Sequence, residues 1–214
     1  MNQTDTQSMR KGEELDVGPL AEFLRNELGA AADELEITQF PAGSSNLTYC
    51  IRLGGSEYVL RRPPFGNQVK SAHDMSREFN VLSKLSAVYA PAPKPLVYCA
   101  DESVIGSEFY LMERRKGLII RGKSPDFLEQ SVDLQYAVCD SFVKNLADLH
   151  ALDYKSIGLD DLGKPEGYVA RQVEGWTKRY FKAKTHDHHE LETAIDWIGT
   201  NIPESTGASL VHND

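Results

Sequence analysis

The sequence is poor in cysteine, which bears on the compartment in which the protein folds. Only three cysteines occur in 214 residues, Cys50, Cys99 and Cys139, and no two of them form a CxxC pair or a metal-type spacing. An odd number of widely spaced thiols argues against the disulfide framework of small secreted domains. We therefore expect a reduced, cytoplasmic protein without a cysteine-based metal site.

Long hydrophobic runs and an excess of positive charge are also missing. No window approaches the roughly 18 consecutive apolar residues of a membrane-spanning helix, and residues 1–18 lack the apolar core of a signal peptide. Lysine and arginine number 23 against 32 aspartates and glutamates, a formal net charge of −9. Because nucleic-acid binders need a basic face, the composition predicts neither a membrane partner nor a nucleic-acid partner.

The composition that remains is typical of a folded protein. Hydrophobic residues make up 41% and charged residues 26% of the chain, and this length suits one domain or two small lobes. Residues 1–17 are the exception, since they contain one leucine and one valine among mainly polar and charged side chains. This segment is predicted to be a disordered tail.

Strand patterns dominate the first half of the chain. In residues 47–53 apolar side chains alternate with others, so that Leu47, Tyr49, Ile51 and Leu53 share one face. A Gly-Gly pair then predicts a hairpin turn. Further strands are expected at 37–40, 58–62, 97–99 and 109–112, with helices at 20–28 and 74–85. Residues 18–113 are therefore predicted to form a lobe of about five antiparallel strands and a helix.

Helical periodicity replaces the strand pattern beyond Gly117. Apolar residues recur at helical spacing over 132–149, around 169–180 and over 191–198. The change falls at a seam near 113–117. The sequence thus predicts an α+β protein with a mainly helical second part, residues 114–214.

Two candidate functional features lie in the strand-rich half. The turn at 41–46 is built of small residues, and such a turn can bring backbone N–H groups close to phosphate oxygens, although most turns of this composition are only turns. Arg61 is on a predicted strand, and Glu78 lies on the inward edge of a predicted helix. A carboxylate there needs a cation, so we predict a pair with Arg61, the alternative being two incidental surface charges.

Two further candidates lie in the helical half. The run from Ser209 to Asp214 is a short apolar stretch that delivers His212 and Asp214 into a loop, which suits either a catalytic carboxylate or a structural loop. The run from His186 to Glu190 could be imagined as a metal site, but no further ligands accompany it. A solvated helix start is the simpler interpretation.

Taken in order, these segments resemble the aminoglycoside phosphotransferase family, a branch of the protein-kinase-like fold that also contains the choline kinases. The nearest likeness is to the kinase-like domain associated with acyl-CoA dehydrogenases. The residues that carry it are Phe40–Tyr49, Tyr58–Pro64, Ser71–Asp74 with Arg77–Phe79, Phe109–Arg114, Leu146–His150 and Leu210–Asp214. The likeness covers the chain from about residue 20 to its end.

The resemblance implies a nucleotide site and its residues. Gly43, Ser44, Ser45 and Asn46 match the loop that covers the nucleotide phosphates. Arg61 matches the phosphate-contacting lysine of the third strand, Val59 lies on the same face, and Glu78 matches the helix glutamate that pairs with that lysine. Met112, Glu113 and Arg115 match the hinge, where backbone groups of Glu113 and Arg115 would bind adenine. Asp214 matches the catalytic aspartate, which would orient the attacking hydroxyl.

The implied function is ATP-dependent transfer of phosphate to a hydroxyl of a small molecule. The family's Mg²⁺ ligands, an asparagine about five residues after the aspartate and a later aspartate, would lie beyond residue 214. We therefore expect this chain by itself to be inactive and to leave helix faces near Phe142 and Trp176 uncovered. Arginine at position 61 departs from the usual lysine. The alternative is a catalytically dead kinase-like module that binds a nucleotide or a protein. The oligomeric state is not predicted.

Overall fold

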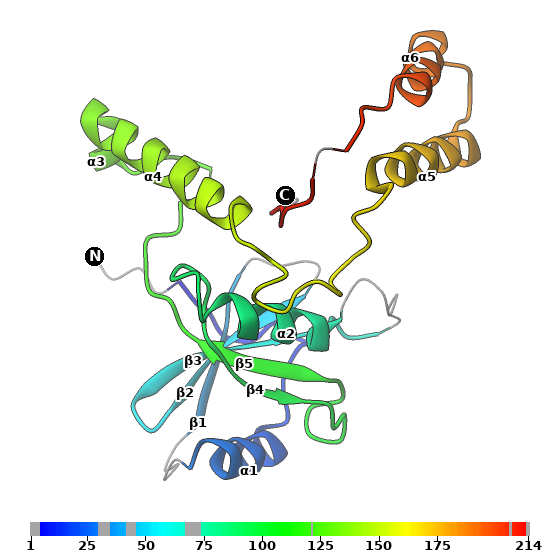
Figure 1. Ribbon diagram of the computed structural model, residues 1–214. Coiled ribbons are helices and arrows are strands. Elements are labelled where there is room, and N and C mark those ends of the chain that lie inside the picture. Colours follow the sequence, from blue (N-terminus) through cyan, green and yellow to red (C-terminus); the bar gives the residue numbers. More distant parts are fainter. Residues whose placement is uncertain are drawn as a thin grey trace. The chain divides into compact units, whose positions relative to one another are not determined.

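The computed structural model describes residues 5–29, 35–41, 46–66, 74–120, 122–205 and 207–212. The chain divides into two compact units, Met1–Ser141 and Phe142–Asp214, whose elements are drawn in Figure 1.

The first unit is built on a five-stranded antiparallel sheet with the strand order β1-β2-β3-β5-β4 (Figure 1). The strands are β1 (Leu35–Gln39), β2 (Leu47–Leu53), β3 (Ser56–Arg62), β4 (Pro95–Cys99) and β5 (Phe109–Glu113). The five antiparallel strands predicted from the alternation are therefore confirmed, with ends shifted by one to two residues.

Strand register separates the residues of the sheet into two faces. Arg61 of β3 lies opposite Thr48 of β2 and Tyr110 of β5, and Val59 lies opposite Cys50 and Met112. Directly opposed residues share a face. The alternate positions, such as Leu60 opposite Tyr49 and Leu111, form the other face, which is the apolar one.

Helix α1 (Val17–Leu28) covers the apolar face and completes the core. Its N-cap is Asp16, whose side chain accepts a hydrogen bond from the Gly18 N–H, and it ends at Gly29 in a left-handed conformation (φ 61°). Leu20 and Leu24 are fully buried. The buried cluster comprises Leu15, Leu20, Leu24, Leu47, Tyr49, Ile51, Leu53, Leu60, Cys99, Ile105, Phe109 and Leu111.

Residues 5–16 pack against this core, contrary to the tail predicted from their composition. Leu15 is 6% exposed, and Gln7 pairs with Gln39 at the edge of β1 through backbone hydrogen bonds of 2.9 and 2.8 Å. The hydroxyl of Tyr49 donates to the carbonyl oxygen of Glu13 at 2.7 Å. One buried leucine and these long-range hydrogen bonds order the segment, and neither leaves a periodic signal in the sequence.

Helix α2 (Met75–Leu85) contacts residues on the face of the sheet that carries Arg61. Asp74 caps its first turn by accepting from the Arg77 N–H at 2.9 Å. The ring of Phe79 lies 5.8 Å from that of Tyr98 and 6.2 Å from that of Tyr110, measured between centroids. This packing places Glu78, one residue before Phe79, beside β3 and β5.

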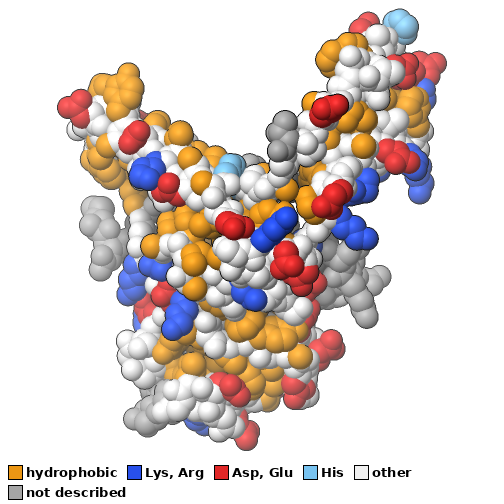
Figure 2. All heavy atoms as spheres, in the orientation of Figure 1, with side chains coloured by type: hydrophobic (Ala, Val, Ile, Leu, Met, Phe, Trp, Pro, Cys, Tyr) orange, Lys and Arg blue, Asp and Glu red, His pale blue; other side chains and the backbone are white. Residues whose placement is uncertain are grey.

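The remaining helices follow the predicted periodicity but bury little. They are α3 (Asp126–Glu129), α4 (Val132–His150), α5 (Tyr168–Ala183) and α6 (His189–Thr200). Helix α3 was not predicted, because four residues are too few to show a period. No residue of α4, α5 or α6 is buried, and Figure 2 shows hydrophobic side chains at the surface of this part of the chain. The expectation that faces near Phe142 and Trp176 lie uncovered is confirmed, with exposures of 68% and 63%.

None of the helices in the described ranges combines the length and the apolar character that a membrane span requires.

Candidate functional site

The predicted pairing of Arg61 with Glu78 is present. Nε of Arg61 donates to Oε2 of Glu78 at 2.8 Å, and each side chain is about one third exposed. The register of β3 and the packing of α2 bring the two residues together, although 17 positions separate them in the chain. The pair lies at the surface of the unit, where a ligand can reach it.

Glu78 receives two further hydrogen bonds, which fix both of its carboxylate oxygens. Nδ2 of Asn46 donates to Oε1 at 3.0 Å, and the hydroxyl of Tyr110 donates to Oε2 at 2.9 Å. Burial raises the pKa of Tyr110, and the neighbouring Glu78 carboxylate raises it further, so this hydroxyl keeps its proton. With three donors from three segments, the carboxylate can hold Arg61 in one orientation.

Tyr110 was missed by the sequence reasoning, because no local pattern in the sequence places it beside Arg61. It lies directly opposite Arg61 in the β3–β5 pairing, and a tyrosine there shares the face of the arginine. Asn46 was predicted as part of the phosphate loop. The structure shows its side-chain amide bonded to Glu78, at 5% exposure, which links Asn46 to α2.

The guanidinium of Arg61 retains donors for a ligand. Only its Nε bonds to Glu78, and the described part of the chain offers no hydrogen-bond partner to its two Nη groups. A planar cation with two such groups matches the oxygens of a phosphate or carboxylate. The arrangement is therefore chemically suited to binding an anion.

The predicted hinge follows directly from β5. The backbone N–H of Glu113 donates to the carbonyl oxygen of Lys94 at 2.9 Å, so this amide is not open to a base. Nη2 of Arg115 donates to the carbonyl oxygens of Ala90 (3.0 Å) and Ala92 (3.3 Å), and Nε lies 2.6 Å from Oε1 of Glu113. These contacts fix the segment, and Met112 before it is half-buried.

The strip of sheet between Arg61 and the hinge is apolar and enclosed. Val59 is 8% exposed and Cys50, opposite it, is 4% exposed. Burial raises the pKa of the Cys50 thiol, which keeps it neutral. Such a strip could pack against the flat face of a base.

A cluster of charges lies beyond this strip around Glu57, at the start of β3. Its carboxylate lies 2.9 Å from Arg52, 2.8 Å from Arg114 and 2.7 Å from Lys116. Hydrogen bonds from Lys116 and Arg52 lower the pKa of Glu57 to about 2, against the desolvation that burial causes. The sequence reasoning did not single out this cluster, because its members come from three separate segments.

Four predicted site residues lie outside the described part of the chain: Gly43, Ser44, Ser45 and Asp214. In the second unit, the backbone N–H of His212 donates to Nε2 of His150 at 3.4 Å. The described stretch that precedes Asp214 thus lies beside the end of α4. His189 is the first residue of α6, as the helix-start interpretation predicted.

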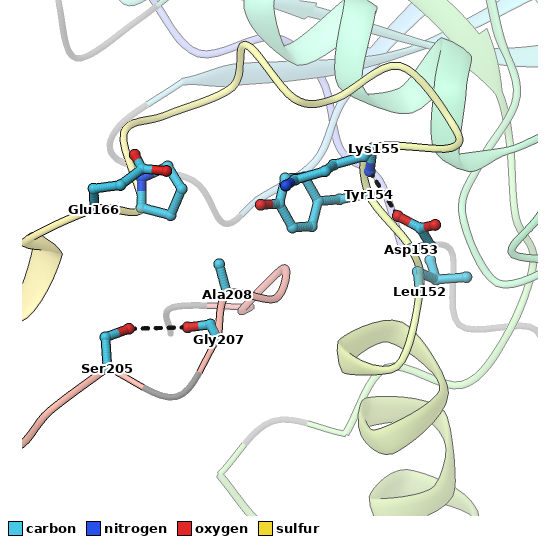
Figure 3. A pocket seen from close by; sticks show the side chains of 9 residues that line it. Leu152, Asp153, Tyr154, Lys155, Glu166, Ser205, Gly207 and Ala208 are labelled. Atoms are coloured by element: carbon cyan, nitrogen blue, oxygen red, sulfur yellow. Dashed lines mark hydrogen bonds between the residues drawn. The ribbon is translucent and has the colours of Figure 1, made fainter.

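A cavity of about 530 Å³ opens in the second unit (Figure 3). It is lined by Leu152, Asp153, Tyr154, Lys155, Pro165, Glu166, Ser205, Gly207 and Ala208. Oδ1 of Asp153 accepts from the backbone N–H of Lys155 at 3.1 Å, and the Ser205 hydroxyl donates to the carbonyl oxygen of Gly207 at 3.2 Å. These polar groups of the cavity therefore form hydrogen bonds within the neighbouring turns.

Comparison with known proteins gives the family. Residues 36–214 match the model of the phosphotransferase enzyme family (APH). The chain belongs to this family. The match includes the sheet, the Arg61–Glu78 pair and the predicted hinge.

Relatives of this phosphotransferase-family chain include parts of larger proteins. Acyl-CoA dehydrogenase family member 11 of Rattus norvegicus is 37% identical over 215 residues, which cover 98% of this chain and 27% of that protein. Acyl-CoA dehydrogenase family member 10 of Mus musculus is 36% identical over 211 residues, covering 98% of this chain and 20% of that protein. The chain thus spans about a quarter of the length of these curated relatives.

A solved structure supports the fold of the family chain. A crystal structure from Ralstonia eutropha, provisionally assigned as an aminoglycoside phosphotransferase, superposes with a TM-score of 0.75 at 32% identity, covering 89% of this chain and 55% of that one. The resemblance stated from the sequence is confirmed. So is the α+β, protein-kinase-like fold class.

Proposed function

We propose that this phosphotransferase-family chain carries the nucleotide-binding part of an ATP-dependent phosphotransferase that acts on a hydroxyl of a small molecule. The observation that carries the proposal is the Glu78 carboxylate, which receives Arg61, Asn46 and Tyr110 at 2.8–3.0 Å. Because this network lies at the surface of the unit, its role is to orient the Arg61 guanidinium and not to pack a core.

Different residues of the site bind different parts of the nucleotide. Arg61 binds phosphate oxygens through its Nη groups, because Glu78 holds its Nε side. Val59 packs against the base, and the segment from Met112 to Arg115 borders it with backbone groups other than the Glu113 N–H, which donates to Lys94. Gly43, Ser44 and Ser45 are proposed to cover the phosphates with backbone N–H groups. ATP supplies the phosphoryl group that is transferred.

The acceptor side rests on Asp214, which is proposed to orient the attacking hydroxyl and accept its proton. Within the described ranges, no three His, Cys, Asp or Glu side chains are grouped so that they could hold a metal ion. The ligands of Mg²⁺ are proposed to lie beyond residue 214.

The acceptor is proposed to be a small hydroxylated molecule. The name of the Ralstonia eutropha relative suggests aminoglycosides, whereas the curated relatives are acyl-CoA dehydrogenase family members. The curated relatives, which cover 98% of this chain at 36–37% identity, make a hydroxyl on an acyl compound the first acceptor to assay.

Nucleotide titration of the 214-residue chain tests the binding step. We expect Mg·ATP to bind weakly and Arg61→Ala to abolish this binding, with Arg77→Ala, on the neighbouring helix α2, as a matched arginine control. Phosphate transfer is then assayed with any in-frame sequence that follows codon 214. Binding without transfer in that longer chain would favour the alternative, a catalytically dead module. Binding that survives Arg61→Ala would contradict the proposed site.

A further inference from the structure

The side chain of Arg114 lies across the strip of sheet next to the hinge. Arg114 follows β5 directly, and its Nη1 donates to Sγ of Cys50 at 3.1 Å. Its guanidinium carbon is 5.7 Å from the ring centroid of Phe40. The side chain is only 12% exposed, which is low for an arginine outside the core.

Two carboxylates from distant parts of the chain, Asp5 and Glu57, hold this guanidinium. Nη1 lies 2.8 Å from Oε2 of Glu57, and Nη2 lies 2.5 Å from Oδ1 of Asp5. Asp5 belongs to the N-terminal segment, which the Gln7–Gln39 pairing fastens to β1. The arginine is therefore held between a strand of the sheet and a segment added to its edge.

Arg114 contacts Cys50, which borders the position that the proposed function gives to the base. Cys50 lies opposite Val59, and Val59 lies opposite Met112, so these three side chains form one row across the sheet. A base packed on Val59 would contact Cys50 as well. The guanidinium already in contact with Cys50 would have to move before the base could enter.

We propose that Asp5, Arg114 and Glu57 form a latch that closes the base end of the nucleotide site. This inference rests on the proposed function. Nucleotide binding selects the state in which Arg114 has left Cys50, so the measured affinity is the intrinsic affinity multiplied by the fraction of open molecules. Weakening the latch therefore raises the affinity, although it removes a cation from the neighbourhood of an anionic ligand.

Asp5→Asn tests the latch, because it removes one charge and leaves the shape of the side chain. Two quantities are measured: the rate at which a thiol reagent modifies Cys50, followed by peptide mass spectrometry in a Cys139→Ser background, and the dissociation constant of Mg·ATP. We expect Asp5→Asn to raise the modification rate and the affinity two- to fivefold, the size of one partly exposed ion pair. Arg114→Gln should raise both further.

Arg52→Gln is the matched control, since Arg52 also pairs with Glu57, whereas the hydrogen bond to Sγ of Cys50 comes from Arg114. It should change neither quantity. An unchanged rate of Cys50 modification in both latch variants would overturn the latch. Faster modification together with weaker nucleotide binding would also overturn it, because Arg114 would then be a residue that binds the nucleotide. If the wild type and all variants fail to bind nucleotide, both the proposed function and the latch are overturned.

Discussion

Arg61 and Glu78 meet through a hydrogen bond of 2.8 Å from Nε to Oε2, although one lies on β3 and the other on α2. The pair joins the two elements on the side of the sheet away from the apolar core. Because Asn46 and Tyr110 complete the coordination of the carboxylate, its loss should disturb the direction of the guanidinium more than the stability of the fold.

Glu78→Ala should therefore weaken nucleotide binding at least tenfold while lowering the free energy of unfolding by only about 1 kcal/mol. Titration calorimetry and urea denaturation measure the two quantities. Glu108→Ala is the control, since Glu108 accepts a hydrogen bond from Tyr98 but has no part in the site. Equal losses of binding and stability for Glu78→Ala would mean that the residue is merely structural.

Tyr110→Phe removes one donor to Glu78 and keeps the ring that packs on Phe79. We expect nucleotide binding to weaken by a factor of about three to ten, the value of one hydrogen bond to a charged group in a partly exposed site. Tyr98→Phe makes the same chemical change on the neighbouring strand β4, and its binding curve should match that of the wild type. Identical binding curves for the wild type, Tyr110→Phe and Tyr98→Phe would show that Tyr110 is not part of the site.

Glu57 should make the stability of the first unit depend on pH below about 4.5. Its pKa falls from 4.5 to about 2 in the folded chain, so the folded state favours the ionised form. The stability this provides is present above the unfolded-state value and is lost as pH falls toward 2. Urea denaturation between pH 5 and 2 should show a shallower slope for Glu57→Gln than for wild type, and parallel curves would refute this assignment.

The chain's two tryptophans should report only on the second unit. Trp176 and Trp197 are 63% and 65% exposed, so their emission should resemble that of indole in water and should be quenched efficiently by acrylamide. Denaturation should shift the wavelength of maximum emission only a little. Blue-shifted, protected emission that returns to the exposed value on dilution would instead indicate that chains associate through these apolar helix faces.

Much of the secondary structure could be predicted because hydrophobic periodicity is local. Strand β2 begins and ends where its alternation does, and α2 begins after Asp74, a residue that caps helices. The tail assigned to residues 1–17 was wrong for residues 5–16 because their order depends on distant partners. Leu15 enters a core made by α1 and the sheet, and Gln7 pairs with Gln39.

The candidate site was predicted only in part. The pair of residues 61 and 78 could be predicted because an unpaired buried charge is costly. A carboxylate that faces inward at position 78 therefore needs a nearby cation, and the arginine at position 61 can supply it. Tyr110 and Arg114 carry no such signal. Their places follow from the strand order, which puts β5 beside β3 although 46 residues separate Arg62 from Phe109.

By itself, the amino-acid sequence determined which segments become strands and helices, and which charged residues needed partners, because these depend on neighbours within a few positions. The tertiary structure alone decided that β5 lies next to β3, that Tyr110 and Asn46 share Glu78, and that Asp5 reaches Arg114. Those contacts depend on how the sheet is ordered and on which edge is covered, and many strand orders satisfy the same local pattern.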